Sequence, residues 1–172
     1  MTVFITRELR HKDRAMKEAE IDSFLEIATV GRLGLSLNNQ PYVVPLNFAY
    51  KKGHIYLHSA ETGMMIDFLK NNSSVCFEVD EHFATISAPM VCEYDAAYRS
   101  VIAFGSARIV TDLKEKTATL RFIVAKYAGP EQAERITESM VDQYRSSLDS
   151  KTVTIDMAIE RVTGKAWQPR ES

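Results

Sequence analysis

The chain has 172 residues, of which 45% are hydrophobic, enough to bury one substantial core but short for two independent domains. Its 21 basic residues nearly balance 23 acidic ones, and the formal net charge of -2 disfavours nucleic acid and anionic lipid as partners. We therefore expect a single domain over residues 1–172. Because no apolar run approaches the roughly 20 residues of a membrane span, and Met1–Arg7 lacks a signal-peptide stretch, we expect a cytoplasmic protein with no membrane partner.

The first third of the chain predicts a helix and then an antiparallel meander. Apolar residues recur at helical spacing between Lys17 and Thr29, which indicates an amphipathic helix. From Val30 the apolar residues alternate, as they do along a half-buried strand. Turn-forming residues at 38–40 and 51–53 separate three such strands. The strands are predicted to start at Val30 and to span Tyr42–Tyr50 and His54–Ser59.

The middle of the chain predicts a helix that interrupts the sheet and a long loop between two further strands. Thr62 can cap the helix, and the strand Ser74–Val79 follows it. Periodicity is weak from Glu81 to Ala97, so this segment is interpreted mainly as a loop. The segment Tyr98–Val110 carries apolar residues on both faces, which is typical of a central strand.

The last third predicts two helices and one strand. Asp112 can cap a helix that runs to about Tyr127, and a more polar helix follows near Glu131–Tyr144. Alternation in Thr152–Val162 indicates a half-buried strand. About six strands and three to four helices, without a βαβ rhythm, predict an α+β, mainly β fold around an antiparallel sheet or barrel.

Common catalytic and metal-binding motifs are absent from the sequence. Cys76 and Cys92 have no CxxC spacing and are interpreted as reduced thiols, buried or half-buried. The four histidines also lack the paired spacing of a metal site, so no metal is predicted. They are His11, His54, His58 and His82.

Several short segments together resemble a known family. They are Gly31-Arg32-Leu33-Gly34, residues 40–50 (QPYVVPLNFAY), residues 55–60 (IYLHSA), Tyr98-Arg99-Ser100-Val101 and Phe104-Gly105-Ser106-Ala107. In order and spacing, and with the opening segment Arg10–Arg14, they resemble the pyridoxamine-phosphate-oxidase-like flavoproteins, and most closely their nitroimidazole-resistance branch. The resemblance covers roughly Arg10 to Tyr127. It implies a split β-barrel of about six antiparallel strands that forms a homodimer and holds FMN at the dimer interface.

The resemblance also implies site residues. His58 would be the catalytic residue, as a proton or hydrogen-bond donor beside the flavin, because its two protonation states are both accessible near neutrality. Alternatively, Pro45 only blunts an edge strand, His58 is a satisfied half-buried histidine, and Trp167 is a packing anchor. The implied FMN-binding residues are Val44, Pro45, Leu46, Asn47, Phe48, His58, Ser59, Thr62, Arg99, Ser100 and Trp167.

The sequence departs from the family where the flavin phosphate is expected to bind. The family usually has a lysine here, in the form Gly-x-Lys or Gly-Lys-Lys, but this chain has Gly63-Met64-Met65. A phosphate requires fixed cations or backbone N–H donors. The substitutes that the sequence offers are Lys12, Arg14, Arg32, Arg99 and the N-terminus of the helix near Thr62.

The leading functional hypothesis is an FMN-dependent oxidoreductase. It would reduce a small aromatic or nitro compound with electrons from a reduced nicotinamide or another carrier. The alternative is a non-catalytic flavin- or haem-binding protein on the same fold, with His58 or His82 as the haem ligand. Oxidation of pyridoxamine phosphate is less favoured, because the basic residues are not concentrated where a second phosphate would bind.

Overall fold

The computed structural model describes residues 9–168, so Met1–Arg7 lies outside the described residues. The strands form one seven-stranded antiparallel sheet in the order β2-β1-β5-β6-β7-β4-β3, which confirms the mainly β prediction with one strand more than expected. The strands are β1 (Val30–Leu37), β2 (Gln40–Asn47), β3 (Ala49–Lys51), β4 (His54–Ala60), β5 (Ser74–Ile86), β6 (Asp95–Val110) and β7 (Thr152–Trp167). The helices are α1 (Glu18–Ile27), α2 (Met64–Asn71), α3 (Leu113–Ala128), α4 (Pro130–Glu134) and α5 (Glu138–Gln143), with short 3-10 turns at Lys12–Arg14 and Val91–Glu93.

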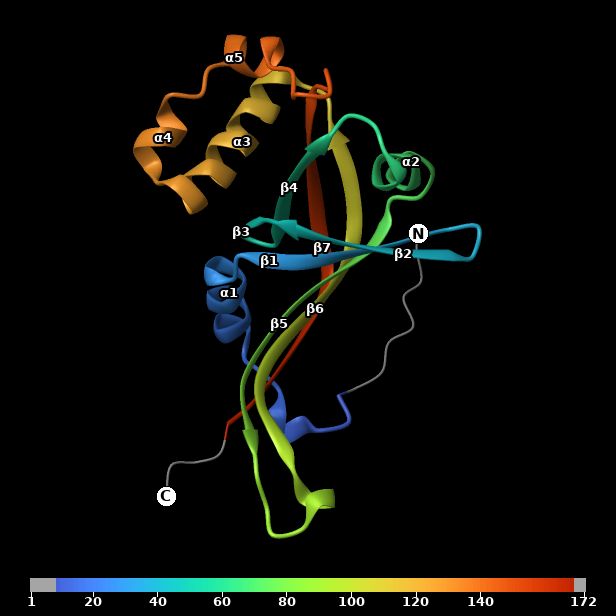
Figure 1. The fold of residues 1–172 in the computed structure, drawn as a ribbon, viewed down its shortest axis with the longest axis vertical. Helices are drawn as coiled ribbons and strands as arrows, with labels where there is room; N and C mark the ends of the chain where they lie inside the picture. The colour runs from blue at the N-terminus through green and yellow to red at the C-terminus, as the bar shows by residue number, and fades with distance from the viewer. Residues whose placement is uncertain (1–8, 169–172) are drawn as a thin grey trace.

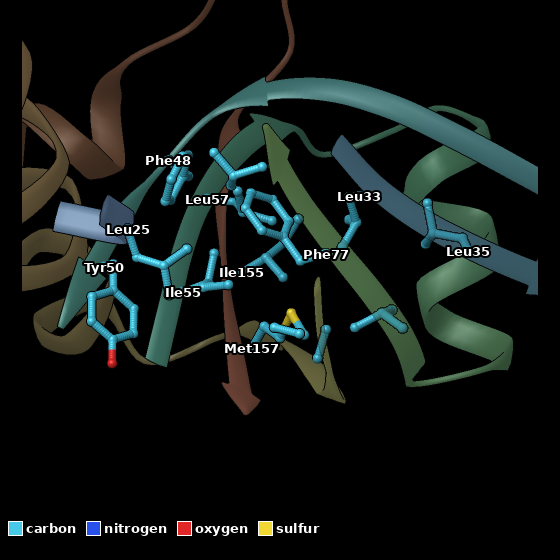
Figure 2. Close-up of a cluster of buried hydrophobic side chains, with 14 of the residues drawn as sticks. Leu25, Leu33, Leu35, Phe48, Tyr50, Ile55, Leu57, Phe77, Ile155 and Met157 are labelled. Atoms are coloured by element: carbon cyan, nitrogen blue, oxygen red, sulfur yellow. The ribbon is translucent and has the colours of Figure 1, made fainter. Parts of the chain in front are cut away.

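The sheet curls around an apolar core. Its two edge strands, β2 and β3, are consecutive in the chain, and β2 also contacts β4. The aromatic rings of Phe48 and Phe77 meet edge to face inside the curl, with centroids 4.9 Å apart (Figure 2). Helices α1 and α2 contribute buried side chains to the same core, whereas α3 lies on the other face of β4 and β7, with α4 and α5 packed against it (Figure 1). The largest fully buried side chains include Leu25, Leu33, Phe48, Ile55, Leu57, Phe77, Ile155 and Met157.

The predicted strand Tyr42–Tyr50 is broken at Phe48. The Phe48 N–H donates to the hydroxyl of Tyr127 at 2.9 Å, and the carbonyls of Phe48 and Thr29 lie 2.8 and 2.6 Å from the same hydroxyl. Tyr127 thus bonds the backbone groups of Phe48 where the strand ladder is interrupted near the core. The break separates β2 from β3 and turns the Phe48 ring inward.

The contact predicts that Tyr127→Phe lowers the free energy of unfolding by about 1–3 kcal/mol, because the part-buried N–H of Phe48 loses its acceptor and a backbone carbonyl loses the hydroxyl donor. Urea unfolding followed by circular dichroism measures the change. Tyr94→Phe, at an exposed tyrosine, is the matched control and should change stability by less than about 0.5 kcal/mol. Equal effects of the two substitutions would contradict this role of Tyr127.

The interpretation of residues 81–97 mainly as a loop is correct only for residues 87–94, which contain the 3-10 turn Val91–Glu93, and is wrong for both ends of the segment. Strand β5 continues to Ile86 and pairs with β6 as far as Asp95, so the two strands form an arm that projects from the curled sheet (Figure 1). Residues 80–85 are exposed, and the register shifts between His82 and Ala84. A strand without a buried face needs no alternation of apolar and polar residues, which is why periodicity did not reveal the arm.

Four smaller predictions also need correction. Thr62 does not cap α2, because Gly63 is the N-cap residue and no side chain caps this helix. The polar helix near Glu131–Tyr144 is two short helices, α4 and α5. Strand β7 continues past Val162 to Trp167, and Cys92 is exposed.

The predicted cap of α3 is confirmed, since the side chain of Asp112 accepts a hydrogen bond from the N–H of Glu115 at 2.8 Å. Within residues 9–168, no helix is long and apolar enough to cross a membrane.

Candidate functional site

Strand β2, which carries the residues predicted to run past the flavin ring, lies at an edge of the sheet. Val44 and Leu46 are half-buried and pack against the core, whereas Pro45 and Asn47 are exposed. Within the described part of the chain β2 forms a ladder only with β1, so the other edge of its backbone is not used by the sheet. Such an edge presents hydrogen-bond donors and acceptors to a ligand or partner, and Pro45 removes one of the donors.

His58 lies on the face of β4 that points away from the core. Its neighbour Leu57 is fully buried, and alternation along a strand turns His58 to the opposite face, where it pairs with Thr154 of β7. His58 is at the mouth of a cavity of about 310 Å³ that α3 and α5 help to line. One side of the residue stays exposed, while desolvation of the ring lowers the pKa of His58 from its ordinary value. The imidazole is therefore mainly neutral at pH 7.

Ser59 is half-buried and pairs with Val153.

The start of α2 offers backbone donors but no lysine. Gly63 adopts a φ of +125°, and the amides of the first turn have no side-chain cap. Met65 stands where the Gly-x-Lys form has its lysine, and only 6% of its surface is exposed because the side chain packs in the core. Met64 is 45% exposed. Asp67 lies in the same turn, and its negative charge weakens the attraction of this helix end for an anion.

The arginines proposed as substitutes for that lysine all have carboxylate partners. The pairs are Arg14 with Asp95 (2.7 Å), Arg32 with Glu78 and Asp80 (2.9 and 2.5 Å), and Arg99 with Glu81 (2.8 and 2.6 Å). A hydrogen bond from the Ala96 amide and the Arg14 guanidinium lower the pKa of the Asp95 carboxyl, which stays ionised. Lys12 lies in a 3-10 turn and also has an interaction partner. A phosphate would have to compete with these carboxylates.

The remaining predicted residues lie at the base of the arm, where the end of β7 pairs with β6. Arg99 stacks on the ring of Phe24 at 4.1 Å and lines a hollow of about 390 Å³. Ser100 pairs with Lys165. Trp167 ends β7 beneath the Arg14 guanidinium, which is 4.5 Å from its ring. The indole N–H of Trp167 and Nε of Arg14 are buried without a hydrogen-bond partner among residues 9–168, and such unpaired donors are uncommon unless a ligand or partner satisfies them.

In one copy of the chain His58 and Ser59 form one group of predicted site residues, and Arg99, Ser100 and Trp167 form another. Asn47 of β2 donates a hydrogen bond to the Thr29 carbonyl at 3.1 Å, beside the hollow that Arg99 lines. Strand β7 connects the groups, since His58 pairs with Thr154 and Arg99 pairs with Ala166. The separation along β7 is 166 − 154 = 12 residues, which corresponds to about 40 Å of strand. One copy therefore does not bring both groups to a single small ligand.

Comparisons with known proteins decide the family. A family model described as pyridoxamine 5'-phosphate oxidase matches residues 17–166. The chain belongs to this family. No curated protein matches the chain.

Among solved structures, the flavocytochrome Anf3 from Azotobacter vinelandii is 20% identical, with a TM-score of 0.79 over 95% of this chain and 74% of that one. A candidate 5-nitroimidazole antibiotic resistance protein from Bacteroides thetaiotaomicron is 24% identical, with a TM-score of 0.66 over 88% and 85%. A FAD-binding protein from Mesorhizobium loti is 25% identical, with a TM-score of 0.62 over 90% and 98%. These likenesses agree with the split-barrel fold.

In this member of the pyridoxamine 5'-phosphate oxidase family, reasoning from the sequence missed the cavity beside His58. Leu120 and Val124 of α3 line this cavity together with Met140 and Tyr144. No local signal identified these residues as a site, because a helix face that lines a cavity has the same spacing as one that packs against a sheet. Among residues 9–168, no group of three or more His, Cys, Asp or Glu side chains is placed to hold a metal.

Proposed function

We propose that the chain is a flavin-dependent oxidoreductase that binds FMN and reduces a small nitroaromatic or related acceptor. The electron donor would be a reduced nicotinamide or another carrier. The observation that carries the proposal is the family match over residues 17–166, which includes the β2 strand and the His58-Ser59 pair from which flavin binding was inferred. Solved structures with a similar fold are described as a flavocytochrome and as FAD-binding proteins, which also supports a flavin.

A homodimer would bring the two groups of predicted residues together. In the proposed arrangement, His58 and Ser59 of one copy meet Arg99, Ser100 and Trp167 of the other. The separation of the groups along β7 supports it. Apolar side chains are exposed on the outer face of the sheet and on the arm, and a second copy would cover such surfaces. They are Val30, Val43, Phe83, Met90, Val91, Tyr94 and Ile102.

Each part of the predicted site would have a separate role. The free edge of β2 would hydrogen-bond the polar edge of the flavin ring, and the uncapped first turn of α2 would bind the phosphate. The flavin, when bound, supplies the electron transfer. The neutral ring of His58 would donate a hydrogen bond to the acceptor. The small fraction of His58 that is protonated would deliver a proton, and the lowered pKa makes this form a stronger acid.

The first experiment is to record the visible spectrum of the purified protein, add excess FMN, desalt, and measure bound flavin per chain. We expect about one FMN per chain, and then oxidation of reduced nicotinamide that depends on an added nitroimidazole. A colourless protein that does not retain FMN would contradict the proposal. Retained flavin without turnover would favour the non-catalytic alternative.

The missing lysine gives a second prediction. Met64→Lys should tighten FMN binding about tenfold, because a charge-assisted hydrogen bond to the phosphate is worth about 1.5 kcal/mol. The side chain of Met64 is exposed, so the lysine needs no burial. Fluorescence titration with FMN measures the change, and riboflavin, which has no phosphate, is the matched ligand. Met64→Gln is the control for side-chain length. An equal gain for riboflavin would show that the phosphate is not involved.

A further inference from the structure

A cavity on the outer side of the β4–β7 pair is formed by the helices that follow β6. Helix α3 crosses this face, where Phe122 packs edge to face on Tyr56 with centroids 5.5 Å apart. The chain then reverses at Gly129 and packs α4 and α5 against α3 (Figure 1). The space left between α3, α5 and the ends of β4 and β7 is about 310 Å³, which is within the size range of small-molecule sites.

The wall of this cavity is almost entirely apolar. Ile123 and Val141 are buried in it, whereas Met140 and Tyr144 remain 55% and 54% exposed although both line it. Two large side chains that line a cavity and still face solvent are incompletely packed by their own chain. Because water gains few hydrogen bonds from apolar walls, such a cavity favours an apolar ligand over water.

The polar groups of the cavity are few and uncharged. The sheet contributes His58 and Thr152, and α5 is followed directly by Tyr144 with its hydroxyl. No lysine, arginine or carboxylate is among the residues that line the cavity. Beside His58, the hydroxyl of Thr154 is fully buried and has no hydrogen-bond partner among residues 9–168. Within the cavity of one copy, a ligand with a carboxylate or phosphate would lose its hydration without a compensating cation.

We infer that this cavity binds a small, uncharged aromatic molecule that makes one hydrogen bond with His58. The apolar side chains of α3 and α5 would contact the faces of the ring, and the histidine at the mouth would fix its orientation. Helices α3–α5 thereby act as a ligand-binding element. Because the proposed function places His58 beside the flavin, the same molecule would be the electron acceptor. That last connection rests on the proposed function, but the binding itself does not.

The test uses flavin-free full-length protein, so that its outcome is independent of flavin binding. Isothermal titration calorimetry compares 2-naphthol, naphthalene-2-carboxylate and naphthalene. We expect saturable binding of 2-naphthol, at least tenfold weaker binding of the carboxylate, and intermediate binding of naphthalene. No saturable binding of 2-naphthol, or tighter binding of the carboxylate, would overturn the inference. This comparison needs only the unmodified chain.

Variants then locate the site. Val124→Phe fills the cavity and should weaken 2-naphthol binding at least tenfold, whereas Leu148→Phe, at an exposed residue that does not line the cavity, should not change it. His58→Leu should reduce 2-naphthol binding to the level of naphthalene, and His82→Leu, on the arm, should leave it unchanged. Circular dichroism verifies that each variant is folded. Binding that is insensitive to both Val124→Phe and His58→Leu would overturn the assignment to this cavity.

Discussion

Gly105→Ala is expected to lower the free energy of unfolding by more than about 4 kcal/mol or to prevent folding. A Cβ atom at this position would lie 1.9 Å from the carbonyl oxygen of Ala158 and 3.2 Å from Cα of Ile159. Both atoms belong to the backbone of β7, so no side-chain rotation can relieve the collision. The position coincides with the register shift between Phe104 and Gly105, where β6 and β7 approach closely.

Gly34→Ala is the matched control for this prediction. A Cβ at position 34 would meet the carbonyl oxygen and Cβ of Cys76 at 3.4 and 3.7 Å, which is ordinary van der Waals contact. We therefore expect Gly34→Ala to change stability by less than about 1 kcal/mol. Urea unfolding of the two variants measures both effects. If Gly105→Ala shifted the urea midpoint no more than Gly34→Ala does, that result would contradict the close approach of β6 and β7 at Gly105.

His58→Ala is expected to lower kcat for the nitro acceptor about a hundredfold at equal flavin content, the size of effect that loss of a positioned acid or hydrogen-bond donor produces. His58 is the histidine that lines the cavity where we place the acceptor. His82→Ala, at an exposed position on the arm, is the control and should leave kcat unchanged. Activity is expressed per bound flavin, so that a loss of cofactor is not mistaken for a loss of catalysis.

The pH profile separates a chemical role of His58 from a structural one. Burial lowers the pKa of His58, so the protonated ring is a minority at pH 7 and its population grows as the pH falls towards that pKa. If the protonated ring delivers the proton, kcat rises with falling pH across this range, and the rise disappears in His58→Ala. A rise of the same shape in the variant would assign the proton to another group.

Local patterns in the sequence were sufficient where one side of an element faces the core. The helical spacing in α1 follows directly from burial of one face, and the helix is present. Strand β7 is present too, but it is not half-buried as predicted, because Thr154–Met157 are buried on both faces where α3 packs against the strand. The Asp112 cap is also a local interaction, three residues long, and was predicted correctly. The segments that resemble the family occur in β1, β2, β4 and β6, and the family match confirms the resemblance.

Local patterns failed where the structure depends on residues distant in the sequence. The β5 side of the arm has no buried face to mark it, since residues 80–85 are exposed. Strand β2 ends before Phe48 because Tyr127, far along the chain, bonds the backbone groups of Phe48. The buried state of Met65 is likewise set by packing in the core. None of these contacts leaves a short-range signal.

For the candidate site, the sequence by itself determined which residue types are available: the β2 segment, the His58-Ser59 pair, and methionine in place of a lysine after Gly63. The tertiary structure decided where they lie. It placed Arg99 and Trp167 about 40 Å along β7 from the strand pair that holds His58, gave the arginines carboxylate partners, and opened an apolar cavity beside His58. The reason is physical: residue identity fixes charge and hydrogen-bonding capacity, whereas distance, desolvation and pairing arise only when segments far apart in the chain pack together.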